Sequence, residues 1–245
     1  QINEKLRKKI ALHIGLFCNH TPDFSATESF LHRIKVKKED ITELRYRGSG
    51  WPGFMKISLK NGRTIKVALP LYWKFLGLDF FIPRSCLLCN DGLNELADLS
   101  FGDAWLPSVL SKDNMGASIV VVRSITGENI IQGARKYGKV KLTKISPEEV
   151  VKSQLSNIYF KKVILKSRAK FLGMSFSNNI IETGVLDSIY ALFCILNSQF
   201  LSKSIFFKFI LKKAPMKIIN SYYLFPNFLY SKMLNNFRKK LLIDV

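Results

Sequence analysis

The chain has few cysteines, few histidines and few acidic residues for its length. Four cysteines in 245 residues are too few for a disulfide framework, and a chain this long can bury a core without one. The N-terminal residues, QINEKLRKKI, lack the apolar run of a secretory signal peptide. The histidines at 13, 20 and 32 are not spaced as metal ligands, and no GxxxxGK loop or Ser/His/Asp motif is present. The known nucleotide-triphosphatase and serine-hydrolase patterns are therefore excluded.

The composition is that of a folded, strongly basic protein. Hydrophobic residues make up 47% and charged residues 23%, which excludes wholesale disorder. Lysine and arginine total 38 against 18 aspartate and glutamate, a net charge of +20. This excess favours anionic partners. Because the charge is spread along the chain and no nucleic-acid-binding module is recognisable, nucleic acid is not an expected partner.

The hydrophobic pattern predicts a mixed α/β fold, with a mixed sheet core and a mainly helical, basic C-terminal part. Strands are expected at 11–18, 41–47, 54–60, 64–69, 117–123 and 139–144. Asn61-Gly62 is a strong hairpin signal between two of them. A helix is expected over 25–38, and another opens at 146–154, with Ser146 as its cap and Pro147 in its first turn.

The charge changes near residue 150. Residues 1–150 carry 23 basic and 15 acidic side chains, whereas residues 151–245 carry 15 and 3. We therefore expect a core domain over 1–150 and a helical basic region over 151–245.

A run of 15 uncharged residues, 188–202, is shorter than the roughly 20 that a spanning helix needs, so no transmembrane span is expected. Lysines at 203, 208, 212 and 213 then alternate with apolar residues. This pattern fits a core helix followed by a basic amphipathic helix, which docks within the protein, on a partner subunit or on a membrane surface. The expected location is the cytoplasm, with membrane association left open.

The pair Cys86 and Cys89 carries the clearest metal signal. Two thiolates three positions apart can bind one metal centre, and zinc or an iron–sulfur cluster wants about four ligands. Cys18 ends a predicted strand and is a reasonable third ligand, whereas Cys194 lies in an apolar helix pattern and is expected to be a packed thiol. A redox pair and an incidental pair remain alternatives.

Two further segments could line a cofactor pocket. In RYRGSGWPG (45–53), glycines let the backbone approach a bulky ligand, arginines hold phosphates, and Trp51 can stack on a flat ring. In ADLSFGDAW (97–105), two acids and a glycine follow the cysteine pair closely. The alternatives are a strand connection with solvated arginines and an aspartate that caps a helix.

These blocks, in this order, resemble the C-terminal portion of the beta subunit of coenzyme F-420 hydrogenases and dehydrogenases. The segment LFCNHTP resembles the family's strand-end cysteine, and RYRGSGWPG resembles its arginine–glycine–tryptophan block. The segment CLLCNDGLNELADLSFGDAW resembles the family's cysteine pair and the acidic block that follows it. GASIVVVRSITGE (116–128) resembles the strand and turn that come next. The resemblance covers roughly residues 1–140.

The resemblance implies an iron–sulfur flavoprotein oxidoreductase, with a 4Fe–4S cluster, FAD and coenzyme F-420 (a deazaflavin) or another acceptor as substrate. The implied cluster ligands are Cys18, Cys86 and Cys89. The implied residues of the flavin or acceptor site are Arg45, Arg47, Gly48, Gly50, Trp51, Gly53, Asp98, Gly102, Asp103 and Trp105. No catalytic residue is assigned, and a redox partner subunit or electron carrier is expected.

The family's further cysteine lies upstream, in a G-x-P-C-Q block, and the present chain begins at Gln1-Ile2. We therefore expect a C-terminal fragment or a member truncated at its N-terminus. If the 245 residues are the whole protein, the cluster lacks one ligand. The alternative is a non-catalytic member that keeps the fold and binds a partner, which the missing fourth cysteine supports. Relatives also occur beside functions in polysaccharide synthesis, so the acceptor need not be a deazaflavin.

Overall fold

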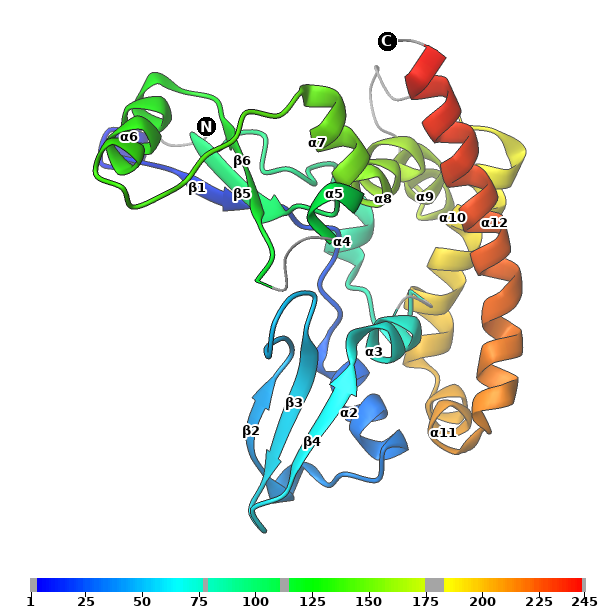
Figure 1. Ribbon diagram of the computed structural model, residues 1–245. Coiled ribbons are helices and arrows are strands. Elements are labelled where there is room, and N and C mark those ends of the chain that lie inside the picture. Colours follow the sequence, from blue (N-terminus) through cyan, green and yellow to red (C-terminus); the bar gives the residue numbers. More distant parts are fainter. Residues whose placement is uncertain (1–3, 77–78, 111–114, 175–182, 244–245) are drawn as a thin grey trace. The chain divides into compact units, whose positions relative to one another are not determined.

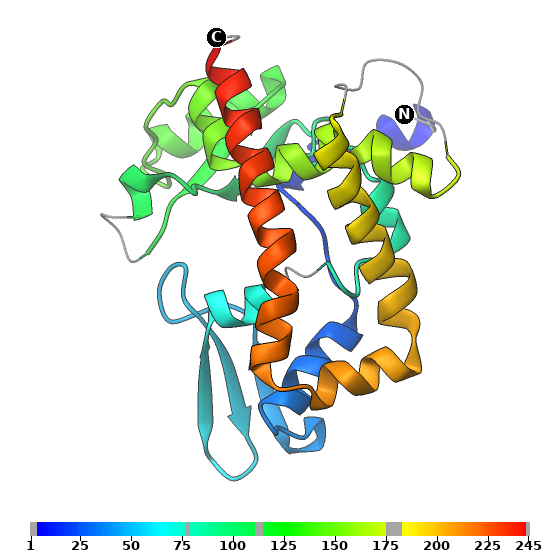
Figure 2. The same cartoon turned by 90° about the vertical axis from the view of Figure 1, so that its right-hand side faces the viewer.

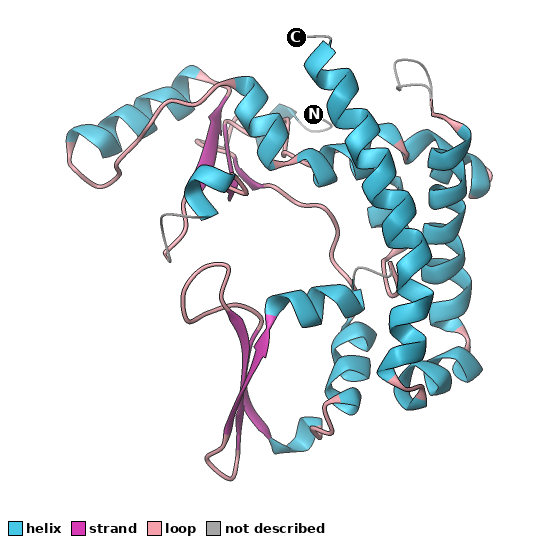
Figure 3. Cartoon of the chain, turned by 45° about the vertical axis from the view of Figure 1, so that its right-hand side comes forward, coloured by secondary structure: helices cyan, strands magenta, loops and turns pink. Residues whose placement is uncertain are grey.

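The computed structural model describes residues 4–76, 79–110, 115–174 and 183–243 (Figure 1). The chain divides into two compact units, each made of segments distant in sequence. Unit 1 contains residues 1–18 and 91–154, and unit 2 contains residues 19–90 and 155–245. Helices outnumber strands in the described part, and the mixed α/β fold with a helical C-terminal part is confirmed (Figure 3). The boundary near residue 150 stays a prediction.

Unit 1 is built on a three-stranded mixed sheet with the order β1-β5-β6. Its elements are α1 (Glu4–Arg7), β1 (Ile14–Leu16), β5 (Leu99–Asp103), α5 (Pro107–Leu110), β6 (Ser118–Val122), α6 (Ile125–Lys136) and α7 (Pro147–Ser153). The central strand β5 pairs parallel with β1 and antiparallel with β6. Leu99 on β5 and Ile119 on β6 are buried, so the sheet carries the unit's apolar core.

Both long helices of unit 1 start at a serine. The Ser124 side chain accepts the N–H of Gly127 at the start of α6. Ser146 accepts the N–H of Glu149, whose carboxylate accepts the Ser146 N–H, and Pro147 occupies the first helical position of α7. The predicted cap at Ser146 is therefore confirmed.

The first segment of unit 2 forms an antiparallel sheet with the order β2-β3-β4. Its elements are α2 (Phe24–Arg33), a 3-10 turn η1 (Lys38–Asp40), β2 (Ile41–Arg45), β3 (Phe54–Leu59), β4 (Thr64–Ala68), α3 (Leu69–Leu76) and α4 (Arg84–Leu88). The hairpin between β3 and β4 turns at Gly62, as predicted. Met55 and Ile57 on β3 are fully buried with Phe30 of α2, so helix and sheet share a core.

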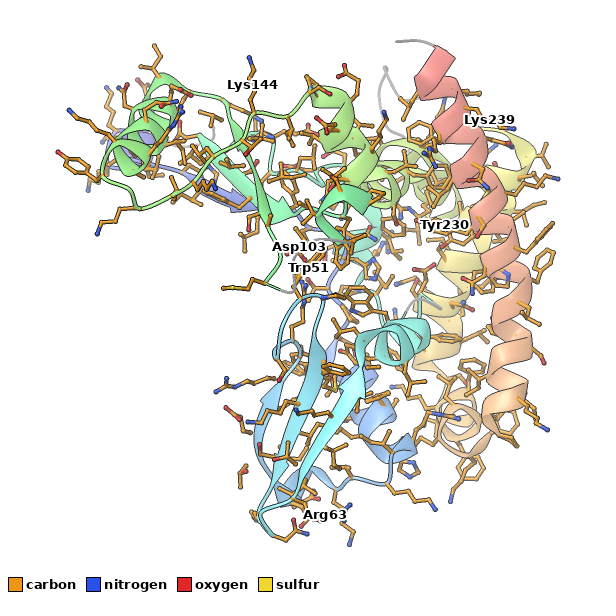
Figure 4. The ribbon with its side chains drawn as sticks, viewed as in Figure 1. Trp51, Arg63, Asp103, Lys144, Tyr230 and Lys239 are labelled. Atoms are coloured by element: carbon orange, nitrogen blue, oxygen red, sulfur yellow. The ribbon has the colours of Figure 1, made fainter. Side chains whose placement is uncertain are left out.

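The second segment of unit 2 is helical throughout its described residues. It comprises α8 (Leu155–Ile158), a π-helix η2 (Tyr159–Val163), α9 (Leu165–Phe171), α10 (Val185–Ile195), a π-helix η3 (Leu196–Phe200), a 3-10 turn η4 (Leu201–Lys203), α11 (Ile205–Lys213) and α12 (Met216–Ile243). The short helix α11 follows α10 and leads into the long α12 (Figure 2). On α12, Tyr230 lies with its ring centroid 5.1 Å from that of Tyr190 on α10 (Figure 4).

One helical segment among the described residues, Val185–Lys203, has the length and apolar composition that a membrane crossing requires. Core helices of soluble proteins share these properties. Tyr190, Cys194 and Ile195 within it are buried in the second core of unit 2. The absence of a transmembrane span stays a prediction.

The structure corrects two expectations. Residues 139–144 form no strand, because the segment between α6 and α7 has no pairing partner and its alternating side chains are mostly exposed. Conversely, residues 99–103 form the central strand of unit 1 although glycine and aspartate disfavour strands. The remaining predicted strands are present with shorter bounds, and the predicted helix 25–38 ends at Arg33.

Candidate functional site

The cysteine pair sits at the end of the short helix α4 in unit 2. The Pro83 carbonyl accepts the N–H groups of Cys86 and Leu87, and the buried Leu87 fixes the helix to the core. Cys86 lies inside α4 and Cys89 follows its end, and both side chains are partly accessible. A short, anchored helix therefore presents both sulfur atoms.

Cys18 lies in unit 1, immediately after β1. Its thiol is free and exposed, and its N–H donates to the Gly92 carbonyl at 2.9 Å. The described residues contain no group of three or more His, Cys, Asp or Glu side chains placed to hold a metal. The assignment of all three cysteines to one centre is therefore a proposal.

Cys194 is a different kind of thiol. It is fully buried on α10, and its sulfur lies 3.1 Å from Oδ2 of Asp79. Burial, and then the neighbouring carboxylate, raise the pKa of this thiol well above its ordinary value. Cys194 is thus a packed thiol, as its apolar surroundings in the sequence predicted.

The arginine–glycine–tryptophan segment forms the loop between β2 and β3. The N–H of Phe54 donates to the Gly48 carbonyl at 2.9 Å and closes the loop. The loop contains a cis peptide bond between Trp51 and Pro52. Trp51 is half-buried, and its position in the loop can be followed in Figure 4.

The glycines of this loop differ in what they are needed for. Gly53 has φ +81°, and a Cβ there would lie 2.5 Å from the Gly48 carbonyl oxygen and 2.6 Å from that of Gly50. Gly50 also has a positive φ, of 96°. At Gly48, by contrast, a Cβ would meet nothing within 4 Å. The loop's own backbone therefore requires glycine at 53 and favours it at 50, whereas it leaves open space at 48.

The two arginines of the segment are exposed. Arg45 pairs with Glu43 on the same strand, with Nη2 2.7 Å from Oε1. The Nε of Arg47 donates to the Pro52 carbonyl at 3.4 Å, across the loop. Arg47 is thus held beside the glycines, whereas Arg45 belongs to a surface ion pair that Lys56 extends.

The acidic block, residues 97–105, connects several elements of unit 1. The Asp98 carboxylate accepts the backbone N–H of His13 at 2.8 Å, and a hydrogen bond with Ser124 is the main cause that lowers its pKa. At Gly102, a Cβ would lie 1.9 Å from Cδ2 of Phe17, so only glycine lets that ring lie across β5.

The end of the block is fixed to helix α7. The Asp103 carbonyl accepts Nε2 of Gln154 at 2.8 Å, and the N–H of Trp105 donates to Oγ of Ser153 at 2.9 Å. Asp98, Gly102 and this anchored turn have clear structural roles. Cofactor contacts at Asp98, Gly102, Asp103 and Trp105 remain proposals.

The sequence analysis missed a group of buried charges in unit 2, here named the buried charge cluster: Asp79, Lys161 and Arg168. Lys161 is 2% exposed and Arg168 is fully buried. The ammonium group of Lys161 donates to the Cys86 carbonyl at 3.4 Å, and Oδ2 of Asp79 accepts the Tyr190 hydroxyl at 3.0 Å. The cluster therefore lies beside the cysteine pair.

Only a weak signal in the sequence pointed to this cluster. Lys161 and Arg168 are seven residues apart, two turns of a helix, within a strongly apolar stretch. Such spacing places both residues on one helix face, but the lysines and arginines of a basic region are usually expected to be exposed to solvent. Only the tertiary structure, in which η2 carries Lys161 and α9 carries Arg168, shows that both cations are buried.

A family model that describes the C terminus of the beta subunit of coenzyme F420 hydrogenase/dehydrogenase matches residues 1–148. The chain belongs to this family. Hydrogenases and dehydrogenases are redox enzymes, so membership assigns the chain to a family of redox electron-transfer proteins. The search of curated proteins found no match.

The search of solved structures found a chain described as "Xenon derivatization of the F420-reducing [NiFe] hydrogenase complex from Methanosarcina barkeri". It is 20% identical with a TM-score of 0.46, and the match covers 71% of the present chain. The present chain spans 57% of the length of that hydrogenase chain.

Proposed function

We propose that this beta-subunit family member is an iron–sulfur flavoprotein oxidoreductase subunit. It passes electrons between a 4Fe–4S cluster and FAD, and on to a deazaflavin such as coenzyme F-420 or to another acceptor. A cluster exchanges single electrons, a deazaflavin exchanges a hydride, and FAD exchanges both. The observation that carries the proposal is the accessible pair Cys86 and Cys89 on an anchored helix beside buried cations.

Cys86 and Cys89 would hold the cluster together with Cys18. Family membership supports the inclusion of Cys18, because the segment LFCNHTP resembles the family's strand-end cysteine and lies within the residues that the family model matches.

The loop after β2 would take the flavin or its acceptor. Gly48 leaves space for a ligand, Arg47 offers a cation beside it, and Trp51 offers a flat ring. Arg45 would contribute positive charge, while Gly50 and Gly53 set the loop's shape. Asp98, Gly102, Asp103 and Trp105 would shape the same neighbourhood.

Anaerobic purification of the protein, followed by an iron assay and a visible spectrum, tests the proposal. We expect a coloured protein with about four iron atoms and bound flavin. The variants Cys86→Ser and Cys89→Ser should lose iron, whereas Cys194→Ala, which changes a packed thiol, should retain it. A colourless wild-type protein without iron and flavin would contradict the proposal.

That colourless result would favour the alternative, a non-catalytic member that binds a partner. One observation supports a binding role of this kind. The helices α11 and α12 expose large apolar side chains, among them Phe206 (73% exposed), Leu224 (69%) and Phe228 (67%). Residues 188–243 contain nine lysines and arginines and no acidic residue. Charge complementarity therefore favours an anionic membrane surface as the partner of this face.

A further inference from the structure

The buried charge cluster carries an excess of positive charge. Among the described residues, Asp79, Lys161 and Arg168 are the charged side chains that are buried, and all three lie in unit 2. Two cations and one carboxylate leave one positive charge uncompensated. A buried charge is stable only when it is paired, so this excess indicates a missing anion.

The carboxylate does not pair closely with either cation. Oδ2 of Asp79 accepts the Tyr190 hydroxyl at 3.0 Å and lies 3.1 Å from the Cys194 sulfur. The ion pairs found among the described residues involve neither Lys161 nor Arg168. Asp79 is thus engaged by neutral donors.

The Arg168 guanidinium has hydrogen-bond donors that no acceptor satisfies. Its Nη2 donates to the Phe160 carbonyl at 2.6 Å, and its Cζ lies 3.7 Å from the Phe160 ring centroid. Its Nε and Nη1 atoms are buried without a hydrogen-bond partner. Each of these two atoms carries an N–H donor that an anionic acceptor can satisfy. Burial also lowers the pKa of Arg168, which an anion would reverse.

The cysteine pair lies in the same unit as the buried charge cluster and beside it. Helix α4, which carries Cys86, packs against α9, which carries Arg168. The ammonium group of Lys161 donates to the Cys86 carbonyl at 3.4 Å. Lys161 lies in the π-helix η2, a backbone form that occurs often at functional sites.

We propose that Arg168 and Lys161 are positioning residues that compensate the negative charge of a metal–thiolate centre at Cys86 and Cys89. This inference rests on the proposed function. The two cations stabilise the thiolates that bind the metal and favour the reduced state of the centre, which carries one more negative charge. The two cations thereby help the protein to retain the metal, and they raise the reduction potential of the centre.

The test compares charge-removing variants, Arg168→Gln and Lys161→Gln, with charge-retaining variants, Arg168→Lys and Lys161→Arg. Matched controls are Lys166→Gln and Lys170→Gln, which remove exposed lysines from the same helix α9. The readouts are iron and sulfide per chain, the midpoint potential by redox titration, and circular dichroism to confirm folding. Thermal unfolding with and without inorganic phosphate reports whether the cations bind a free oxyanion.

We expect the charge-removing variants to lose at least half of the iron and to lower the midpoint potential. A tenfold change in the reduction equilibrium, 59 mV for one electron, is the expected order. The charge-retaining variants should recover most of both properties, and the controls should match wild type. If one charge-removing variant does not fold, the other one, compared with wild type and with the lysine controls, still decides.

Three results would overturn the inference. The first is that Arg168→Gln and Lys161→Gln fold and keep the iron content and midpoint potential of wild type, which would overturn the inference but leave the proposed function intact. Phosphate that stabilises wild type but not Arg168→Gln, with iron unchanged in that variant, would assign the cations to an oxyanion instead. A wild-type protein that binds no iron would remove the proposed function, and this inference with it.

Discussion

The Asp98 carboxylate accepts the backbone N–H of His13 across 2.8 Å, which ties the residue before β1 to the residue before β5. A hydrogen bond with Ser124 joins the same carboxylate to the start of α6. One side chain thus connects three elements of unit 1 that are distant in sequence. Both hydrogen bonds favour the ionised carboxylate, and together they lower the pKa of Asp98.

This relationship predicts an acid-dependent loss of stability. Because the pKa of Asp98 is lower in the folded state than in the unfolded one, its contribution is complete above the unfolded value, about 3.9. The contribution is lost as the pH falls through the folded value. The difference in melting temperature between wild type and Asp98→Asn should therefore shrink below about pH 4. Glu39→Gln, at an exposed carboxylate, is the control and should show no such trend.

Adding a methyl group at Gly102 should destabilise unit 1. The new Cβ would lie 1.9 Å from the Phe17 ring, so Gly102→Ala forces the ring or β5 to move, at a cost of roughly 1–3 kcal/mol. Urea unfolding measures this cost. The control is Gly133→Ala in α6, where a Cβ meets nothing within 4 Å. That substitution should stabilise the helix by about 0.5–1 kcal/mol. Equal effects at both positions would refute the assigned role of Gly102.

Substitutions at two glycines of the loop after β2 should have different effects, one on stability and the other on ligand binding. Gly53→Ala is expected to destabilise the protein by about 1 kcal/mol or more, because φ is positive and two carbonyl oxygens are too close. Gly48→Ala should leave the melting temperature unchanged. If this loop binds the flavin, Gly48→Ala should nevertheless reduce flavin content, measured by absorbance after purification. Normal flavin content in Gly48→Ala would place the flavin elsewhere.

The thiols should differ sharply in reactivity. In metal-free, native protein, iodoacetamide should label the exposed Cys18 first and the partly accessible Cys86 and Cys89 next. Cys194 should remain unlabelled until the protein unfolds, because burial raises the pKa of its thiol. Mass spectrometry of peptides after timed labelling gives the order. Early labelling of Cys194 would show that the α10 core opens readily.

The exposed face of α11 and α12 should bind anionic lipid. Wild type is expected to float with vesicles of phosphatidylcholine and phosphatidylglycerol at low salt, and not with phosphatidylcholine alone. Phe206→Ser combined with Phe209→Ser removes two exposed apolar side chains and should reduce binding at least threefold by the hydrophobic contribution. Phe24→Ser with Tyr137→Ser, which removes two exposed aromatic residues elsewhere, is the control. Equal loss in both double variants would contradict a specific face.

Local patterns predicted the elements whose stability is local. The hairpin at Asn61-Gly62 and the capped helix after Ser146 follow from turn and capping chemistry within a few residues. The segment 139–144 has strand-like alternation without a partner, and β5 is a strand despite Gly102 and Asp103. Both errors arise because a strand is stabilised by its neighbours, which for β5 are β1 and β6.

Residue types at short spacing were enough to predict the family, the mixed α/β class and the presence of the cysteine pair. The tertiary structure alone decided which side chains a basic helix buries. Lys161 and Arg168 look like solvated charges in the sequence. Only the tertiary structure shows that Lys161 contacts the Cys86 carbonyl and that α9, which carries Arg168, packs against α4. The cost of burying a charge depends on its surroundings in space, and these are set by contacts between segments more than 70 residues apart.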